Sequence, residues 1–287
     1  MSELLPKPWL DGGHAGIGSM AITWDGRGSM ATRAVARWRS RGTGAGRWRR
    51  AQWLDGGHAG RARTETKVIK INAVIAHLLA PHVPRAARAL GIQRTVAGGV
   101  ALTFDDGPHP DGTPAVLDVL DGAGIKATFF LVGEQVERRP ALASEIAARG
   151  HVVALHGYRH RPQPVLRGRV VDDDLARGAA AIAEAAGVEP VWHRPPYGLY
   201  SPAGLEAACA RGLKPLLWSR WGKDWRRLTT PERIAARAMR DLGAGDVILL
   251  HDADFYSSKG SHERTAEALK LIVRELKLQK TSTVLPL

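Results

Sequence analysis

GGVALTFDDGP, residues 98–108, joins an apolar run to two adjacent carboxylates and an Asp-Gly-Pro turn. The Val, Leu and Phe of this run are typical of a strand buried on both faces, which belongs to a parallel sheet. The turn itself needs only one aspartate. A second carboxylate at the end of a buried strand repels the first, so the pair favours a nearby cation or a catalytic role. Asp105 and Asp106 are therefore candidate metal-binding or catalytic residues.

Further apolar runs follow, separated by helical patterns. They occupy 126–132, 151–155, 190–194, 214–219, 246–251 and 282–287. The helical segments begin with Ser, Thr, Asp or Pro and end with Gly, which are helix start and stop signals. Strand and helix thus alternate through seven repeats that end in a strand. This order predicts a parallel α/β fold, either a barrel or a doubly wound sheet.

The unusual polar residues gather at the carboxyl ends of the predicted strands. His156 and His160 follow the third strand, Arg194 the fourth and Asp224 the fifth, and His251 ends the sixth. In α/β barrels and open sheets, active sites are built at that face. We therefore expect these side chains to form one site with the two aspartates.

HGYRH, residues 156–160, places two imidazoles on one face if the segment is helical. Two imidazoles and one carboxylate leave a fourth position for water around zinc, which is the arrangement of catalytic zinc sites. The same ligands suit non-haem Fe(II). The ligand set alone therefore leaves both a hydrolase and an oxygenase open.

Two further strand-end residues have simpler alternatives. Arg194 begins RPPYG, which is compatible with a rigid loop carrying a solvated arginine, but the nearby carboxylates favour an ion pair with Asp105 or Asp106. Asp224 is followed by Trp, and its carboxylate could orient His251, as carboxylates commonly do for catalytic imidazoles.

The net charge of +13 on 287 residues is unevenly distributed. Residues 1–95 hold 16 Lys/Arg and 5 Asp/Glu, a net of +11, whereas residues 96–287 hold 25 and 23, a net of +2. The basicity therefore belongs to the N-terminal third of the chain. Any argument from charge towards nucleic acid applies to that third alone.

Residues 1–66 are rich in Gly, Arg and Trp, show no apolar period, and contain WLDGGHAG twice, at 9–16 and 53–60. One interpretation is a basic aromatic arm for single-stranded nucleic acid or an anionic polymer. The others are a disordered appendage, or a stretch outside the mature protein with a start at Met20 or Met30. We expect disorder here, and nucleic-acid binding is disfavoured.

The remaining predictions concern the chain as a whole. Residues 67–96 are expected to form a short helical lead-in, with an amphipathic helix within 68–80, before a domain over 97–287. No apolar run is long enough for a membrane helix, and the start lacks a signal-peptide layout. We therefore expect a cytoplasmic monomer, with export left open. The single cysteine, Cys209, excludes an intrachain disulfide and is expected to be buried.

Five motifs in order, TFDDGP, HGYRH, RPPYG, DW and LLHD, resemble those of the polysaccharide deacetylases that carry the NodB homology domain, carbohydrate esterase family 4. The resemblance covers residues 97–287 and implies a distorted (β/α)7 barrel. It implies a hydrolase that removes N-acetyl groups from an amino-sugar polymer or oligomer, such as peptidoglycan or a chitin-like chain, and releases acetate. The implied cofactor is a divalent ion, zinc first and cobalt or nickel otherwise.

By this resemblance, Asp106, His156 and His160 hold the metal ion. Asp105 is the general base that takes a proton from water, and Arg194 positions it.

The resemblance also assigns the other side of the site. His251 is the general acid and Asp224 tunes it. The backbone N–H of Tyr197 helps hold the oxyanion, Leu249 lines the pocket for the acetyl methyl group, and Trp225 packs beneath the site.

The chain departs from the family pattern at two positions. Gly157 stands where Ser or Thr usually supports the loop by hydrogen bonding, and Trp221 stands where a second carboxylate is often found. Loop support and substrate contacts are therefore expected to differ. An O-acetyl esterase on xylan or a similar polymer and a degenerate, non-catalytic carbohydrate-binding barrel remain as alternatives.

Overall fold

The computed structural model describes residues 21–24, 30–33 and 75–286. The chain divides into two compact units, Met1–Gly56 and Gly57–Leu287. In the first unit, β1 (Ala21–Trp24) and β2 (Met30–Arg33) pair antiparallel. The disorder predicted for residues 1–66 falls outside the described residues, apart from these two strands. The domain boundaries predicted at residues 66 and 96 stay predictions.

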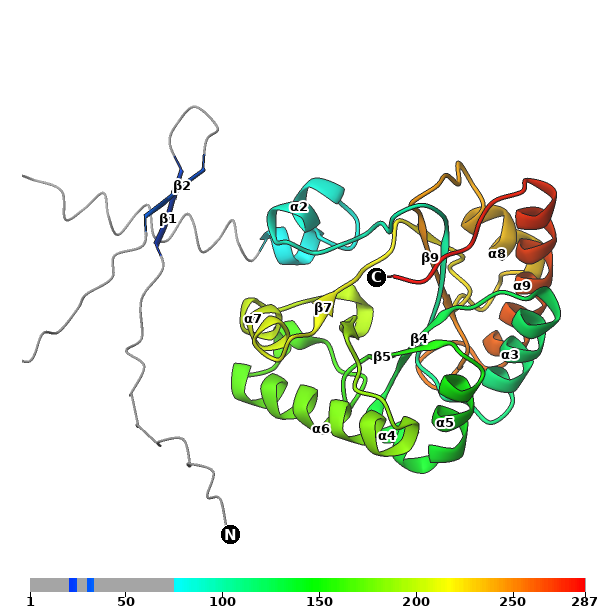
Figure 1. Cartoon of the computed structure of the whole chain (residues 1–287), viewed down its shortest axis with the longest axis horizontal. Helices are drawn as coiled ribbons and strands as arrows, with labels where there is room; N and C mark the ends of the chain where they lie inside the picture. Colours follow the sequence, from blue (N-terminus) through cyan, green and yellow to red (C-terminus); the bar gives the residue numbers. More distant parts are fainter. Residues whose placement is uncertain (1–20, 25–29, 34–74, 287) are drawn as a thin grey trace, which may run out of the picture. The chain divides into compact units, whose positions relative to one another are not determined.

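A curled sheet of parallel strands forms the centre of the second unit (Figure 1). Its strands are β3 (Ala101–Asp105), β4 (Thr128–Leu131), β5 (Val152–Leu155), β6 (Trp192–His193), β7 (Lys214–Pro215), β8 (Arg220–Trp221) and β9 (Val247–His251). Their spatial order is β7-β6-β5-β4-β3-β9-β8, and each neighbouring pair is parallel. Every residue of β3, an inner strand between β4 and β9, is buried. The predicted parallel α/β class is confirmed.

Helices surround this sheet (Figure 1). They are α2 (Pro84–Ala89), α3 (Gly112–Ala123), α4 (Gly133–Arg138), α5 (Pro140–Ala148), α6 (Gly168–Ala186), α7 (Pro202–Ala210), α8 (Pro231–Ala238) and α9 (Ser261–Leu278), with short 3-10 turns η1 (Gln163–Val165) and η2 (Pro196–Gly198). The side chains of Ser201 and Thr230 cap α7 and α8 by accepting backbone N–H groups. Gly124 and Gly187 end α3 and α6 in the left-handed conformation, as the stop signals predicted.

The seventh strand differs from the prediction. The segment 282–287 was expected to complete the sheet, but its described part makes an isolated bridge from Thr283 to Val100, before β3 begins. Two residues in WSRWGKDW form β8 instead and pair with β9. A two-residue strand is too short to show an apolar alternation, so the sequence pattern gave no sign of it.

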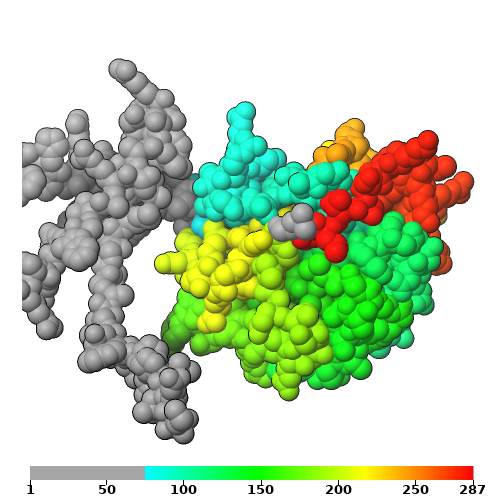
Figure 2. All heavy atoms as spheres, viewed as in Figure 1, coloured from blue at the N-terminus to red at the C-terminus, as the bar shows by residue number. Residues whose placement is uncertain are grey.

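The lead-in pairs with two segments next to strands of the sheet. The end strands β7 and β8 do not neighbour each other in the sheet order. Gln93 pairs with Leu216 beyond β7, and Thr95 pairs with Asp246 just before β9. Figure 2 shows the lead-in lying against the chain near β7. The described part of the helix predicted within 68–80 is helical over residues 75–79, with His77 buried.

Cys209 is exposed, so the prediction of a buried thiol was wrong. The buried positions of α7 are Gly204 and Ala208, and the next residue along the helix turns towards solvent. No helix in the described part of the chain combines the length and apolar character that a membrane span requires.

Candidate active site

A pocket of about 220 Å³ lies at the carboxyl ends of the strands. Its walls are Asp105, Asp106, His156, His160, Tyr197, Gly198, Trp218, Trp221, Trp225, Leu249, His251, Tyr256 and Ser257. Parallel strands all end at this face, which brings together residues that are far apart in sequence. Of the predicted site residues, only Arg194 and Asp224 are absent from the walls, because both are fully buried behind them.

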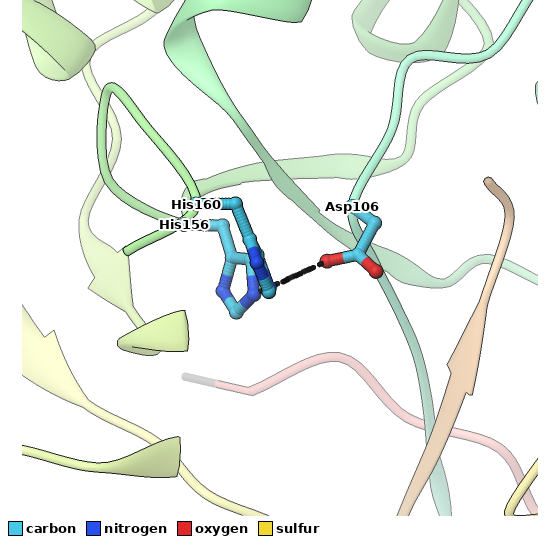
Figure 3. Close-up of side chains that lie close together, drawn as sticks. All are labelled: Asp106, His156 and His160. Carbon is cyan, nitrogen blue, oxygen red and sulfur yellow. Dashed lines mark ion pairs between the residues drawn. The ribbon is translucent and has the colours of Figure 1, made fainter. Parts of the chain in front are cut away.

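Three of these side chains point towards one another (Figure 3). Asp106 follows β3 in a left-handed backbone conformation (φ 81°), and both histidines follow β5. Its Oδ1 lies 3.4 Å from His156 Nε2 and 3.2 Å from His160 Nε2. Two ligands held about 2.0–2.1 Å from a tetrahedral zinc ion stand roughly 3.3 Å apart. The spacing therefore fits three ligands of one ion.

The protons in this cluster also favour a cation. His156 Nδ1 lies 2.7 Å from the carbonyl oxygen of Arg194. That oxygen only accepts, so Nδ1 carries the proton and a neutral ring presents a lone pair at Nε2. Asp106 Oδ1 is buried with no hydrogen-bond partner among the described residues. A lone pair facing a buried carboxylate oxygen is stabilised by a positive charge between them.

The pKa of Asp106 agrees with this picture. Burial by itself would raise that pKa. The close approach of His156 and His160, together with the positive charge of His251, nevertheless holds it well below its usual range. Asp106 is therefore an ionised carboxylate at neutral pH, the form that a metal ion would require.

His160 is held differently from His156. Its Nδ1 is buried and makes no hydrogen bond with the part of the chain that is described. Instead, the ring of Tyr256 stacks on it with centroids 4.1 Å apart and planes 9° apart, and Tyr197 meets it edge-on at 4.7 Å. Sequence reasoning missed Tyr256, because it lies in a loop without a motif. Its position shortly after LLHD was the only available sign.

The HGYRH segment is a loop, so the imidazoles do not share a helical face. Gly157 has φ 81°, which a residue with a side chain rarely adopts. Asp174 on α6 supports the loop: its Oδ2 accepts from Tyr158 N at 2.7 Å, and its Oδ1 accepts from Arg161 Nη2 at 2.9 Å. A Cβ at position 157 would come within 3.0 Å of Asp174 Oδ2. Asp174 thus provides loop support where the family usually has a hydroxyl.

Asp105 is paired with Arg194, which is fully buried rather than solvated. Arg194 Nη1 lies 2.6 Å from Asp105 Oδ1, and Asp105 Oδ2 lies 3.8 Å from His156 Nε2. The remaining guanidinium bonds go to the carbonyls of Leu216 and Leu217 and the hydroxyl of Thr103. One carboxylate oxygen of Asp105 is thus fixed, while the other faces His156 in the candidate metal site.

His251 lies on the strand next to Asp105, because β9 pairs with β3 and these two residues are partners in register. Asp224 Oδ1 is 2.9 Å from His251 Nδ1, and Asp224 Oδ2 accepts from His251 N at 2.7 Å and from Thr265 Oγ1 at 2.8 Å. Burial would lower the pKa of His251, but the negative charges of Asp224, Asp106 and Asp105 raise it to about 10. The imidazole is therefore protonated at neutral pH.

The remaining predicted residues complete the pocket. Trp225 lies edge-on to His251, with centroids 5.4 Å apart. Leu249 is a buried wall residue from β9. Tyr197 has a left-handed backbone (φ 61°) within η2, and the residue lines the pocket while 55% exposed.

A second cluster of the same residue types lies nearby, and sequence reasoning missed it. His109 Nε2 is 3.3 Å from Asp254 Oδ1, and His262 Nδ1 is 3.3 Å from Asp254 Oδ2. His109 Nδ1 accepts the backbone N–H groups of Asp111 and Gly112 at 3.1 and 2.9 Å. A neutral His109 therefore carries its proton on Nε2, where a metal ligand would need a lone pair.

Comparison with known proteins identifies a family of similar proteins. A family model described as polysaccharide deacetylase matches residues 93–216. A peptidoglycan-N-acetylglucosamine deacetylase of Bacillus cereus is 34% identical over 182 residues, 63% of this chain and 82% of that protein. A chitooligosaccharide deacetylase of Sinorhizobium fredii is 38% identical over 159 residues, 55% of this chain and 74% of the relative.

Solved structures give the same result. A peptidoglycan N-acetylglucosamine deacetylase in complex with an N-oxidanyl-benzamide superposes with a TM-score of 0.64 at 29% identity, covering 69% of this chain and 92% of its own. A family 4 acetyl xylan esterase of Clostridium thermocellum in complex with a cobalt ion gives 0.58 at 32% identity, covering 64% and 86%. The predicted barrel of the deacetylase type is confirmed.

Proposed function

The chain belongs to the polysaccharide deacetylase family, and on that premise we propose that it is a metal-dependent hydrolase that removes N-acetyl groups from an N-acetylated amino-sugar polymer or oligomer. The substrate would be peptidoglycan or a chitin-like chain, as the names of its relatives suggest. The observation that carries the proposal is the convergence of His156 and His160 on a single unpartnered oxygen of Asp106, beside the separately held Asp105.

Asp106, His156 and His160 would hold a divalent ion, with zinc as the first candidate and cobalt or nickel as the others. A divalent ion in such a site lowers the pKa of water and polarises a carbonyl group. The chain contributes the ligand geometry: the Arg194 carbonyl sets the ring of His156, and stacking on Tyr256 sets the ring of His160. Orienting contacts of this kind commonly support metal affinity.

Asp105 is the proposed general base. Arg194 fixes its Oδ1, so that Oδ2 is left to take a proton from the attacking water. The amide carbon would then lie within the pocket, with the acetyl methyl group against Leu249. The backbone N–H of Tyr197 is the proposed donor to the oxyanion, a contribution that is typically worth several kcal/mol of barrier.

His251 is the proposed general acid. An amine leaves poorly unless it is protonated, and His251 holds a proton at neutral pH because Asp224 raises its pKa to about 10. Asp224 accepts from Nδ1 and from the backbone N–H of His251, so it orients the ring and leaves the Nε2 proton as the one to be donated. General acid catalysis of this kind contributes about 10²–10⁴-fold. The products are acetate and a free amino sugar.

The test is acetate release by the full-length protein from N-acetylated chito-oligosaccharides and from peptidoglycan, after chelation and after zinc is restored. We expect release with zinc and none without it. Absence of acetate from every substrate with zinc present would instead favour a non-catalytic, carbohydrate-binding barrel.

The acetyl xylan esterase among the similar structures gives a second candidate function, hydrolysis of O-acetyl esters. An alcohol leaves more readily than an amine, so it needs His251 less. His251→Ala should therefore reduce turnover of an acetylated amine far more than turnover of an acetylated alcohol. If the native protein acts on acetylated xylan and leaves N-acetyl sugars intact, the esterase is the correct assignment.

A further inference from the structure

A hollow of about 280 Å³ adjoins the active-site pocket, and the side chain of Trp221 lines both. Its other walls are Ser219, Arg220, Lys223, Arg226, Arg237 and Arg240. Five cationic side chains thus surround one small space, and no carboxylate among the described residues lines it. The part of the chain after residue 95 has a net charge of only +2, so five cations in one place exceed what its overall charge would give.

Most of these cations have no carboxylate partner. Arg220 is paired with Asp246 at 3.0 Å. Within the described residues, Lys223, Arg226, Arg237 and Arg240 make no ion pair. A solvated surface arginine often has no partner, but several cations facing one space repel each other unless an anion is present. The hollow therefore favours an anionic occupant.

Two of the cations are held in place. Arg237, half-buried on α8, donates through Nη1 to Thr229 Oγ1 at 2.9 Å. Lys223 has a left-handed backbone (φ 54°), and its Nζ lies 4.4 Å from the ring centroid of Trp221. Burial, together with the charges of Arg226 and Arg237, lowers the pKa of Lys223. These cations are therefore close enough to act on one group.

We propose that this hollow is an anion subsite, which binds a carboxylate carried by the substrate next to the sugar that is deacetylated. The proposal rests on the deacetylase function proposed above. Arginine binds carboxylates strongly through charge-assisted hydrogen bonds, often in pairs. Trp221 lines both spaces, so the proposal is that a sugar bound in the pocket has its neighbour on the side of the cations.

The departure at position 221 points the same way. The resemblance implies that this position often carries a carboxylate, which would repel an anion at the hollow. Trp221 removes that charge and offers an apolar ring in its place. The substitution therefore allows an anionic neighbour where an acidic side chain would oppose one.

The experiment compares two oligosaccharides of equal length, a neutral N-acetylglucosamine oligomer and the same oligomer with a carboxyalkyl ether on alternate sugars. The full chain should have a kcat/KM about tenfold higher for the carboxylated oligomer at low salt, the scale of one hydrogen bond to a charged group. The ratio should fall as salt rises, because salt screens exposed charges.

The double variant Lys223→Gln, Arg226→Gln should bring the ratio close to one, mainly through KM. Arg233→Gln is the control for a lost surface charge, because it removes one charge from α8 outside the hollow, as Arg226→Gln alone removes one inside it. The N-terminal segment is present in every variant, so its charge cancels in the comparison. If the double variant does not fold, Arg226→Gln alone serves, since its side chain is exposed.

A ratio near one in the native protein, or a high ratio that survives the substitutions, would overturn the subsite while turnover of the neutral oligomer still supports the deacetylase. No acetate from either oligomer would overturn the deacetylase function itself.

Discussion

Two clusters in this protein each consist of two histidines and one aspartate, yet they have different chemistry. Asp106, His156 and His160 lie in the pocket, while His109, Asp254 and His262 lie beside it. Nitrogen–oxygen distances are 3.2–3.4 Å in the first cluster and 3.3 Å in the second. Residue type and spacing therefore do not distinguish them.

The distinction lies in which atoms face each other. In the first cluster, both imidazoles converge on one oxygen of Asp106. In the second, each imidazole faces a different oxygen of Asp254. The first arrangement leaves room for one shared ion, whereas the second is a carboxylate bridge between two rings.

The far side of each ring decides the position of its proton. His156 Nδ1 meets a carbonyl and must donate, which frees Nε2 as a ligand. His109 Nδ1 meets two backbone N–H groups and must accept, which places its proton on Nε2. A backbone contact outside the cluster thus separates a candidate metal site from a structural bridge.

The largest expected effect comes from removing a metal ligand. His156→Gln should abolish tight zinc binding and lower kcat/KM for an N-acetylated oligomer by at least about 10³-fold, since a bound ion supplies several kcal/mol. His109→Asn is the matched change in the bridge and should leave the zinc content at one ion per chain. Metal analysis after dialysis and acetate release measure both. Loss of zinc from the His109 variant would contradict the distinction between the clusters.

Asp254→Asn tests the bridge as a structural element. The substitution removes the negative charge that lies 3.3 Å from a nitrogen of each imidazole, at a cost of about 1–3 kcal/mol in the free energy of unfolding. Denaturant unfolding of the zinc-free protein measures this. If stability is unchanged and the zinc stoichiometry falls, Asp254 is a metal ligand and not a structural bridge.

The bridge should also respond to pH. Burial and the positive charge of His262 lower the pKa of His109 from 6.5. The folded chain therefore binds fewer protons at this site than the unfolded chain, so its contribution to stability is present above pH 6.5 and is lost as the pH falls below that value. His109→Asn, which keeps an acceptor near the Nδ1 position, should flatten this part of the curve. If the native protein and the His109→Asn variant show the same dependence of stability on pH, the pKa of His109 does not change on folding.

The smallest effect is expected from changing the contact that orients an imidazole: His156 is held by a hydrogen bond, whereas His160 is held by stacking on Tyr256. Tyr256→Leu removes the ring stacked on His160 and should weaken zinc binding by up to about tenfold, because aromatic pairs contribute roughly 0.5–1.5 kcal/mol. Tyr256→Phe keeps the stacked ring and isolates the part played by the hydroxyl. Isothermal titration with zinc measures both. Equal losses in the two variants would show that the hydroxyl, rather than stacking, supports His160.

The sequence predicted those site residues that lie in a motif at the end of a strand. TFDDGP, HGYRH and LLHD each follow an apolar run, and parallel strands end at one face, so the motifs alone predicted a shared pocket. The prediction failed for residues 282–287, because β8 rather than this segment completes the sheet by pairing with β9. That pairing is a long-range contact, and a two-residue strand carries no sequence pattern that predicts it.

The sequence by itself thus determined the parallel α/β architecture and which residue types meet at its carboxyl face. Tertiary structure alone decided that Arg194 is buried on Asp105, that Tyr256 stacks on His160, and that cations gather beyond Trp221. It also decided which ring nitrogen carries the proton in neutral His156 and in neutral His109. The physical reason is that proton positions and charge pairing depend on atoms brought together across the fold, and no local pattern specifies those partners.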